Sequence, residues 1–146
     1  MKLVARNQKA FFDYEIADEL EAGLVLSGAE IKAIRIKQVN ISGSYIKPFT
    51  KNGQTELWWV GSHFEVNGDQ SRTKKLLLHR REIDRLTGKL TGKGYTILPL
   101  SLYLSRGVAK LKIGLGSRKS AHDKRETLRQ QDIEREIERG LSPKNR

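Results

Sequence analysis

The sequence predicts a mainly β domain of the α+β class: a small closed antiparallel barrel with flanking helices, followed by a C-terminal tail that is disordered when free. Three observations support this: short stretches in which apolar and polar residues alternate, turn signals between them, and a loss of apolar residues from about residue 117. The 146 residues suffice for one core of barrel size. Closing the sheet removes its edges, although the alternation equally fits an open sheet covered by helices.

The first strand is predicted where apolar and acidic residues alternate. Phe12, Tyr14 and Ile16 recur at every second position, which is the period of a strand with one buried face. The apolar run 24–26 continues this character. We therefore expect the chain to begin in a strand.

A helix should begin at Ser27. Glu30 follows three residues later, so each side chain can accept a hydrogen bond from the other's exposed backbone N–H. The helix is expected to end before Asn40, and it leaves Lys32 and Arg35 available to solvent or phosphate.

A hairpin and a second helix follow. Asn52-Gly53 separates the apolar runs 44–46 and 57–60, and an Asn-Gly pair between such runs favours a tight turn because both residues tolerate positive φ. From Lys74 to Leu90, leucine and isoleucine recur three and four residues apart. This spacing predicts a helix over that range.

Two further strands complete the predicted sheet. Leucines occupy alternate positions between residues 95 and 104, and apolar residues alternate with Lys110 and Lys112 between residues 108 and 115. Arg106-Gly107 lies between the two segments and is predicted to form their turn.

Composition indicates a polyanionic partner. The formal net charge is +11 and the pI is about 10.0, and nucleic acid is the leading candidate because each phosphate neutralised by Lys or Arg releases counterions. An anionic membrane is the competing partner, but no spanning stretch, signal peptide or long amphipathic segment with an aromatic face is evident. The chain has no cysteine and three scattered histidines, a poor set for metal binding. We expect a soluble cytoplasmic monomer that binds without a cofactor or metal.

The tail is assigned to 117–146, after a barrel domain over 1–116. Acidic residues precede basic ones by three positions in three pairs, which support a helix by only about 0.2–0.5 kcal/mol each. That is too little to offset the ordering entropy of about 1–2 kcal/mol per residue without a broad apolar face. We therefore expect a free tail that is disordered or fraying and becomes helical on a partner. The pairs are Glu126/Arg129, Asp132/Arg135 and Glu136/Arg139.

Five segments together resemble the SsrA-binding protein (small protein B) family, and they span nearly the whole chain. The resemblance implies an OB-like barrel that binds the tRNA-like domain of transfer-messenger RNA in trans-translation, the rescue of stalled 70S ribosomes. It also implies that the tail enters the empty mRNA channel at the decoding centre and folds there as a helix, and that elongation factor Tu is a partner through the RNA complex. The segments are 5–16, 21–32, 40–45, 72–79 and 122–125, which read ARNQKAFFDYEI, EAGLVLSGAEIK, NISGSY, RTKKLLLH and HDKR.

Carried over by position, the resemblance places RNA contacts on Asn7, Glu21 and Leu77, and a base-stacking residue of the tail on His122. A carboxylate such as Glu21 can accept from a guanine edge or orient a neighbouring arginine, and Leu77 can pack against an unstacked base. Without the resemblance, a leucine in this pattern would be assigned to the core. Further RNA-binding candidates are Lys32, Arg35, Asn40, Tyr45, Arg72, Lys74 and Lys75, and further tail candidates are Arg118, Lys119, Asp123, Lys124 and Arg125.

The chain departs from the family pattern at two places. Lys37-Gln38 and Gly43 replace residues of the loop around Asn40, and 116–120 is less basic than the usual run before the tail motif. The second departure moves the glycine hinge upstream and implies weaker or differently aimed docking of the tail.

The sequence also allows two other functions. A small RNA hydrolase would use Glu21, Glu30 or Asp123 with His79, but nothing in their spacing requires them to lie within hydrogen-bond reach, so we expect no enzyme. A generic OB-type or ribosome-associated RNA-binding protein would bind broadly and stack bases on aromatic residues. Trp58 and Trp59 could serve in that way, although at least one is expected in the core.

Overall fold

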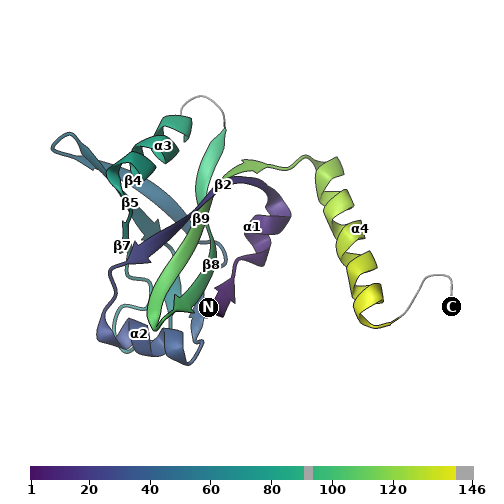
Figure 1. Cartoon of the computed structure of the whole chain (residues 1–146), viewed down its shortest axis with the longest axis horizontal. Coiled ribbons are helices and arrows are strands. Elements are labelled where there is room, and N and C mark those ends of the chain that lie inside the picture. The colour runs from purple at the N-terminus through teal and green to yellow at the C-terminus, as the bar shows by residue number, and fades with distance from the viewer. Residues whose placement is uncertain (91–93, 141–146) are drawn as a thin grey trace.

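The computed structural model describes residues 1–90 and 94–140 and contains a closed six-stranded barrel (Figure 1). Its strands pair in the order β8-β4-β5-β7-β2-β9, and β9 pairs again with β8, which closes the ring. β1 pairs with residues 101–104 of β8, beyond the point at Ile97 where β4 pairs with β8, and β3 and β6 form a separate two-stranded sheet. The prediction of a small closed antiparallel barrel with flanking helices is confirmed. The elements are β1 (Lys2–Arg6), α1 (Gln8–Asp13), β2 (Tyr14–Leu24), α2 (Gly28–Arg35), β3 (Val39–Asn40), β4 (Tyr45–Lys51), β5 (Gln54–Val60), β6 (His63–Phe64), β7 (Lys74–Leu77), α3 (Arg80–Leu90), β8 (Tyr95–Ser105), β9 (Val108–Arg118) and α4 (Ala121–Glu138).

The turns and the α2 cap form where the sequence places them. Asn52 and Gly53 take positive φ between β4 and β5, and Arg106 and Gly107 do so between β8 and β9. The Ser27 hydroxyl accepts from the Glu30 N–H at 3.2 Å, and the Glu30 carboxylate accepts from the Ser27 N–H at 2.8 Å. The predicted hairpins and the first predicted helix are confirmed.

The start of the chain differs from the prediction. Phe12 belongs to α1, and the strand that contains Ile16 begins only at Tyr14. Asn7 caps α1, because its side-chain oxygen accepts from the Ala10 N–H at 3.1 Å. This cap turns the chain into a helix over residues whose apolar spacing also fits a strand.

The predicted second helix is correct only over its second half. Lys74–Leu77 is strand β7, in which positions 74 and 76 are buried and 75 and 77 face outward, and helix α3 begins at Arg80. The run of three leucines hides this change of period, because adjacent apolar residues fit both a strand and a helix. β7 pairs with β5 and with β2, so the ring could not close without it.

The core fills the barrel, and a smaller cluster lies beneath α1. Trp59 is fully buried, contacts Phe64 edge to face at 5.8 Å between ring centroids, and donates to the Ser44 hydroxyl at 2.9 Å. The expectation that at least one tryptophan is core is confirmed. The smaller cluster consists of Ala10, Leu98 and Leu100.

A charged cluster is buried between α2 and β7. The Lys74 side chain is fully buried; its Nζ donates to the Arg72 carbonyl at 2.7 Å and to the Ser62 hydroxyl at 3.2 Å, and lies 3.4 Å from Glu30. Two nitrogens of Arg72 donate to the two Glu30 oxygens at 3.0 and 2.6 Å. Burial opposes ionisation of Glu30, but the bonds from Arg72 and Ser27 and the charge of Lys74 outweigh it and lower the Glu30 pKa to about 2.

Replacing Glu30 with Gln should destabilise the fold at neutral pH, by about 3–5 kcal/mol, because Lys74 becomes a buried cation without its acidic partner. The Glu30 carboxylate has a lower pKa in the folded than in the unfolded chain, so its stabilisation is complete above about pH 4.5 and is lost as pH falls toward about 2. The free energies of unfolding of wild type and E30Q, measured in urea across this range, should therefore converge. The exposed control E15Q should have the same free energy of unfolding as wild type at each pH. A difference between wild type and E30Q that stays constant with pH would contradict the role assigned to the Glu30 charge.

Candidate nucleic-acid interface

Strand pairing brings Glu21 and Leu77 together on the outside of the barrel. Gly23 of β2 pairs with Leu77 of β7 on one side and with Lys110 of β9 on the other, and Glu21 pairs with Lys112. An open cleft of about 450 Å³ lies over these strands. We call it the Leu77 cleft; it is lined by Glu21, Gly23, Leu77, Leu78, His79, Glu82 and Lys110.

Gly23 permits the close packing at the centre of the cleft. A Cβ at this position would lie 3.2 Å from the Leu77 Cβ, tighter than most such contacts. The Leu77 side chain nevertheless stays 52% exposed. An apolar side chain held in this way between strands, and still open to solvent, can pack against an unstacked base.

Glu21 is anchored from below. The Tyr103 hydroxyl of β8 donates to the Glu21 carboxylate. Burial of Tyr103, followed by this hydrogen bond and the Glu21 charge, holds the Tyr103 pKa well above its usual range, so the phenol remains a donor at neutral pH. The carboxylate is thereby fixed while it keeps lone pairs for a ligand, and Lys110 and Lys112 lie beside it.

The other predicted RNA contacts on the barrel fall into different groups. Lys32 and Arg35 are exposed on α2, and Asn40 is exposed in β3. Arg72 is partly exposed but paired with Glu30, and Lys75 pairs with Glu56 at 2.5 Å. The prediction for Lys74 is wrong, because its ammonium is buried against Glu30 and cannot reach a phosphate.

The structure also differs from the prediction that Asn7 contacts RNA. Asn7 is only 2% exposed, caps α1, and donates from its amide to the Pro99 carbonyl at 2.8 Å, so it positions α1 rather than presenting a polar group to RNA. Tyr45 is 45% exposed and lines a second cleft of about 330 Å³ together with Lys9, Tyr14 and Arg118.

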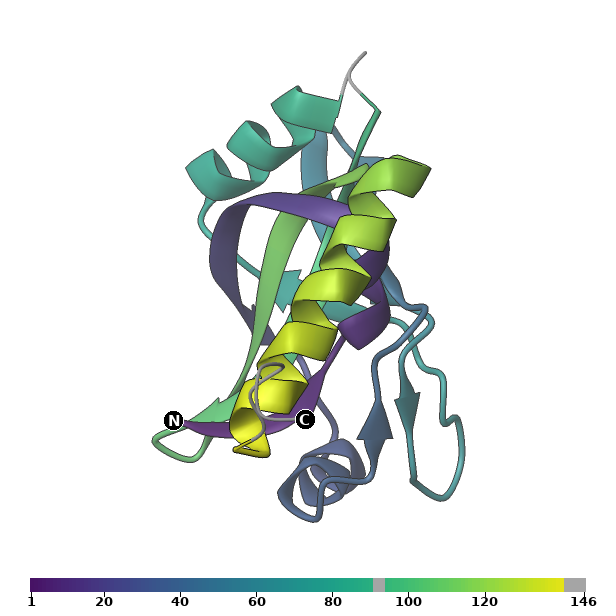
Figure 2. The same cartoon turned by 90° about the vertical axis from the view of Figure 1, so that its right-hand side faces the viewer.

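Tail residues 121–138 form helix α4, which leaves the barrel next to α1 (Figure 2). Ser120 and Asp123 form its capping box. Of its residues in the described part, none is fully buried. Whether the helix melts in the free protein stays a prediction, and residues 141–146 of the predicted tail lie outside the described residues.

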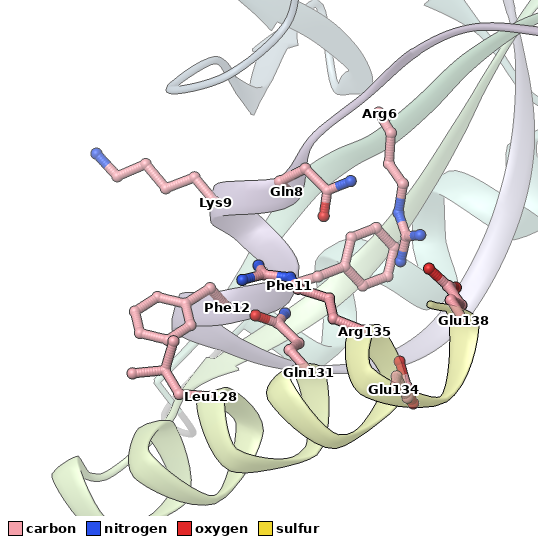
Figure 3. Close-up of a pocket in the computed structure, with 10 residues that line it drawn as sticks. All are labelled: Arg6, Gln8, Lys9, Phe11, Phe12, Leu128, Gln131, Glu134, Arg135 and Glu138. Carbon is pink, nitrogen blue, oxygen red and sulfur yellow. The ribbon is translucent and has the colours of Figure 1, made fainter. Parts of the chain in front are cut away.

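Two lysines attach the tail to α1. Lys119 donates from Nζ to the Phe11 carbonyl at 3.1 Å and to the Thr127 hydroxyl at 2.7 Å. Lys124 lies 3.3 Å from the Asp13 carboxylate. Phe12 of α1 is directed at Leu128 of α4 (Figure 3). Both side chains line an open cleft of about 620 Å³.

The remaining predicted tail residues face solvent. Arg118, His122 and Arg125 are exposed, and Arg118 lies over the Tyr14 ring at 5.5 Å. β9 continues to Arg118, so the boundary between barrel and tail lies after that residue rather than at 116. Gly116 is buried within β9, where a Cβ would lie 2.6 Å from Leu98; the expected upstream hinge is therefore part of the sheet.

Sequence reasoning did not assign Tyr103, Lys110 and His79 to the site. Lys110 and Lys112 alternate with buried Leu111 and Ile113, which placed them on the outer face, but only the pairing of β9 with β2 puts them beside Glu21. In the described part of the chain, no group of His, Asp or Glu side chains could hold a metal ion, and no helix is long and apolar enough to cross a membrane.

Comparison with known proteins gives full-length matches. The family model described as SmpB protein matches residues 4–143. An SsrA-binding protein of Halalkalibacterium halodurans is 45% identical over 99% of this chain and 96% of its own length, and one of Nitratiruptor sp. is 47% identical over 93% and 94%. A solved structure described as "tmRNA-SmpB: a journey to the center of the bacterial ribosome" is 37% identical with a TM-score of 0.62, and covers 86% of this chain and 94% of its own.

Adjacent leucines of β7 provide a test of the cleft. Leu77→Ala should change the free energy of unfolding by less than about 1 kcal/mol, because its side chain is half exposed, and should weaken RNA binding. Leu76→Ala removes a side chain that is 2% exposed and should cost about 2–5 kcal/mol. Chemical denaturation and RNA-binding titrations of both variants measure the two effects. Full RNA affinity in the folded Leu77→Ala variant would remove Leu77 from the interface.

Proposed function

This chain belongs to the SmpB family, and we propose that it binds transfer-messenger RNA and delivers it to stalled ribosomes for trans-translation. The full-length match to SsrA-binding proteins and the likeness to a tmRNA-SmpB structure from the ribosome support this function. The observation that carries it in this chain is the convergence of Glu21 and Leu77, far apart in sequence, in one cleft with lysines at its edge.

The Leu77 cleft holds the tRNA-like domain in this proposal. Leu77 packs against an unstacked base, and Glu21, fixed by Tyr103, accepts from a base edge. Lys110 and Lys112 neutralise nearby phosphates, and Lys32 and Arg35 extend the basic surface along α2. The Glu21 carboxylate repels phosphates but can accept a hydrogen bond from a base. It therefore adds base selectivity to an interaction that is otherwise driven by charge.

The tail carries the ribosomal part of the function. We assign α4 to the empty mRNA channel, with His122 as the base-stacking residue and Arg118 and Arg125 as phosphate contacts, because these three side chains face solvent. The protein then acts in the cytoplasm, where ribosomes are, and meets elongation factor Tu through the RNA complex.

The activity is binding rather than catalysis. Two of the carboxylates that a hydrolase would use are engaged elsewhere, Glu30 in the buried charged cluster and Asp123 in the α4 cap. Glu21 lies in the cleft, where it accepts a hydrogen bond from Tyr103. The alternative is a generic OB-type RNA-binding or ribosome-associated protein, and the barrel and its charge support it as well. Preference for a tRNA-like fold over unrelated RNA separates the two.

A competition assay at near-physiological salt tests the function. Transfer-messenger RNA should bind more tightly than bulk tRNA or a single-stranded RNA of equal length, and E21A should reduce that preference, because the carboxylate reads a base edge. The exposed control E15Q should leave the preference unchanged. Equal binding to all three RNAs, indifferent to Glu21, would support the generic protein instead.

Truncation tests whether the barrel binds the RNA and the tail acts on the ribosome. The truncated chain must keep the end of β9. Deletion after Ser120 removes α4 and leaves β9 intact, so the affinity for transfer-messenger RNA should stay within about threefold while tagging by stalled ribosomes is lost. Deletion after Leu115 also removes the pairing of 116–118 with β2 and should lower thermal stability. Loss of RNA binding in the longer, folded truncation would place RNA affinity in the tail.

A further inference from the structure

The outer face of the β4–β5 hairpin carries alternating aromatic and basic residues that the proposed site does not use. Alternate residues of a strand point to the same side about 6.6–6.8 Å apart. In β4 these outward residues are Tyr45, Lys47, Phe49 and Lys51, all exposed, and we call them the hairpin stripe. Phe49 is 53% exposed and Tyr45 is 45% exposed, so two aromatic rings of one strand face are open to solvent.

The neighbouring strands extend this surface. Lys47 pairs with Trp58 of β5, and Trp58 pairs with Lys75 of β7, so an indole lies in register between two lysines. Trp58 is partly exposed, whereas Trp59 is fully buried. An aromatic ring flanked by cations can stack on a base while the lysines bind its phosphates.

The hairpin stripe is continuous with the Leu77 cleft. A further cleft of about 220 Å³ lies between the β5 and β7 strands and α3; its lining includes Glu56, Lys75, Leu77 and Arg80. Leu77 therefore borders both clefts. Figure 1 shows the hairpin reaching out from the barrel beside α3, and Arg80 of α3 donates to the Thr55 carbonyl at 2.6 Å.

Positive charges on this surface are available to bind a polyanion. Glu56 is the acidic residue opposite Phe49, and Lys75 neutralises it at 2.5 Å. Across residues 1–90 and 94–140, Lys47 and Lys51 have no acidic partner within salt-bridge distance, so their charges remain available to phosphates.

We propose that the hairpin stripe, with Trp58, binds an unpaired segment of transfer-messenger RNA next to the part held in the Leu77 cleft. Bases stack on Tyr45, Phe49 and Trp58, and phosphates lie on Lys47 and Lys51. This proposal rests on the proposed function, because it extends the same RNA interface. RNA fits better than a protein partner, because aromatic rings alternate with lysines and the nearby carboxylate is neutralised.

Tryptophan fluorescence of the full-length protein can detect RNA binding at this surface. The chain has two tryptophans, and Trp59 is buried, so quenching by stacked bases reports on Trp58. Titration with transfer-messenger RNA should quench the emission of wild type, and the quenching should disappear in W58F. Unchanged emission of wild type at saturating RNA would overturn the proposal.

Two sets of variants then test affinity. F49A should weaken binding of transfer-messenger RNA at least about fivefold through lost stacking, and K47Q/K51Q should lower the slope of log affinity against log salt by about 1.4. The matched controls are L3A, an exposed apolar residue of β1, and K2Q/R106Q, which removes the same charge from exposed residues of β1 and of the β8–β9 turn. The proposal would also be overturned if F49A and K47Q/K51Q changed RNA affinity and its salt dependence no more than these controls do.

The two proposals fail in different ways. If wild type prefers transfer-messenger RNA and L77A weakens it, while the hairpin variants do not, the function stands and the hairpin proposal falls. If wild type shows no preference among RNAs, the function itself falls, whatever the hairpin variants do.

Discussion

Closure of the barrel by β8 and β9 is the constraint on which the rest of the structure depends. β8 pairs with β1, β4 and β9, and β9 pairs with β2, so every other strand of the ring is placed relative to this hairpin. A shift of one residue in this register would turn each outward side chain inward. Gly114 and Gly116 keep the strands close, since a Cβ at either position would meet Ile16 or Leu98 at 3.0 Å or less. Backbone pairing therefore places the side chains that we propose to face RNA.

The buried charged cluster ties one helix to this frame. Glu30 of α2 is held by Arg72 and Lys74, so the basic outer face of α2 is fixed relative to β7 and thus to Leu77. A buried ion group of this kind is a weak source of net stability, because desolvation offsets much of its attraction. It is directional, however, and a hydrophobic replacement would not specify the orientation of Lys32 and Arg35 as narrowly.

Local signals predicted local structure well. Ser27 with Glu30, Asn52-Gly53 and Arg106-Gly107 each fix a cap or a turn through their own backbone preferences, and the structure has all three. Residues 74–77 were misassigned because their environment comes from β5 and β2, which are distant in sequence. The same limit applies to Lys74, whose acidic partner is 44 residues away, and to the lysines beside Glu21. Asn7 and Leu77 came from the family pattern, and only burial separates a positioning residue from an exposed one.

The tail is attached to α1 mainly by weak polar contacts, and α4 itself buries few apolar side chains. The Lys124–Asp13 pair is partly exposed, and such pairs contribute about 0–1 kcal/mol and are screened by salt. Lys119 is held more firmly, by a carbonyl and a hydroxyl, but it lies at the base of the tail. The helix beyond it has no fully buried side chain to retain it on the barrel. The base of the tail is thus anchored, and the rest of α4 is held only weakly. In the proposed function, a polyanionic channel that offers several phosphates would therefore outweigh the one carboxylate of α1.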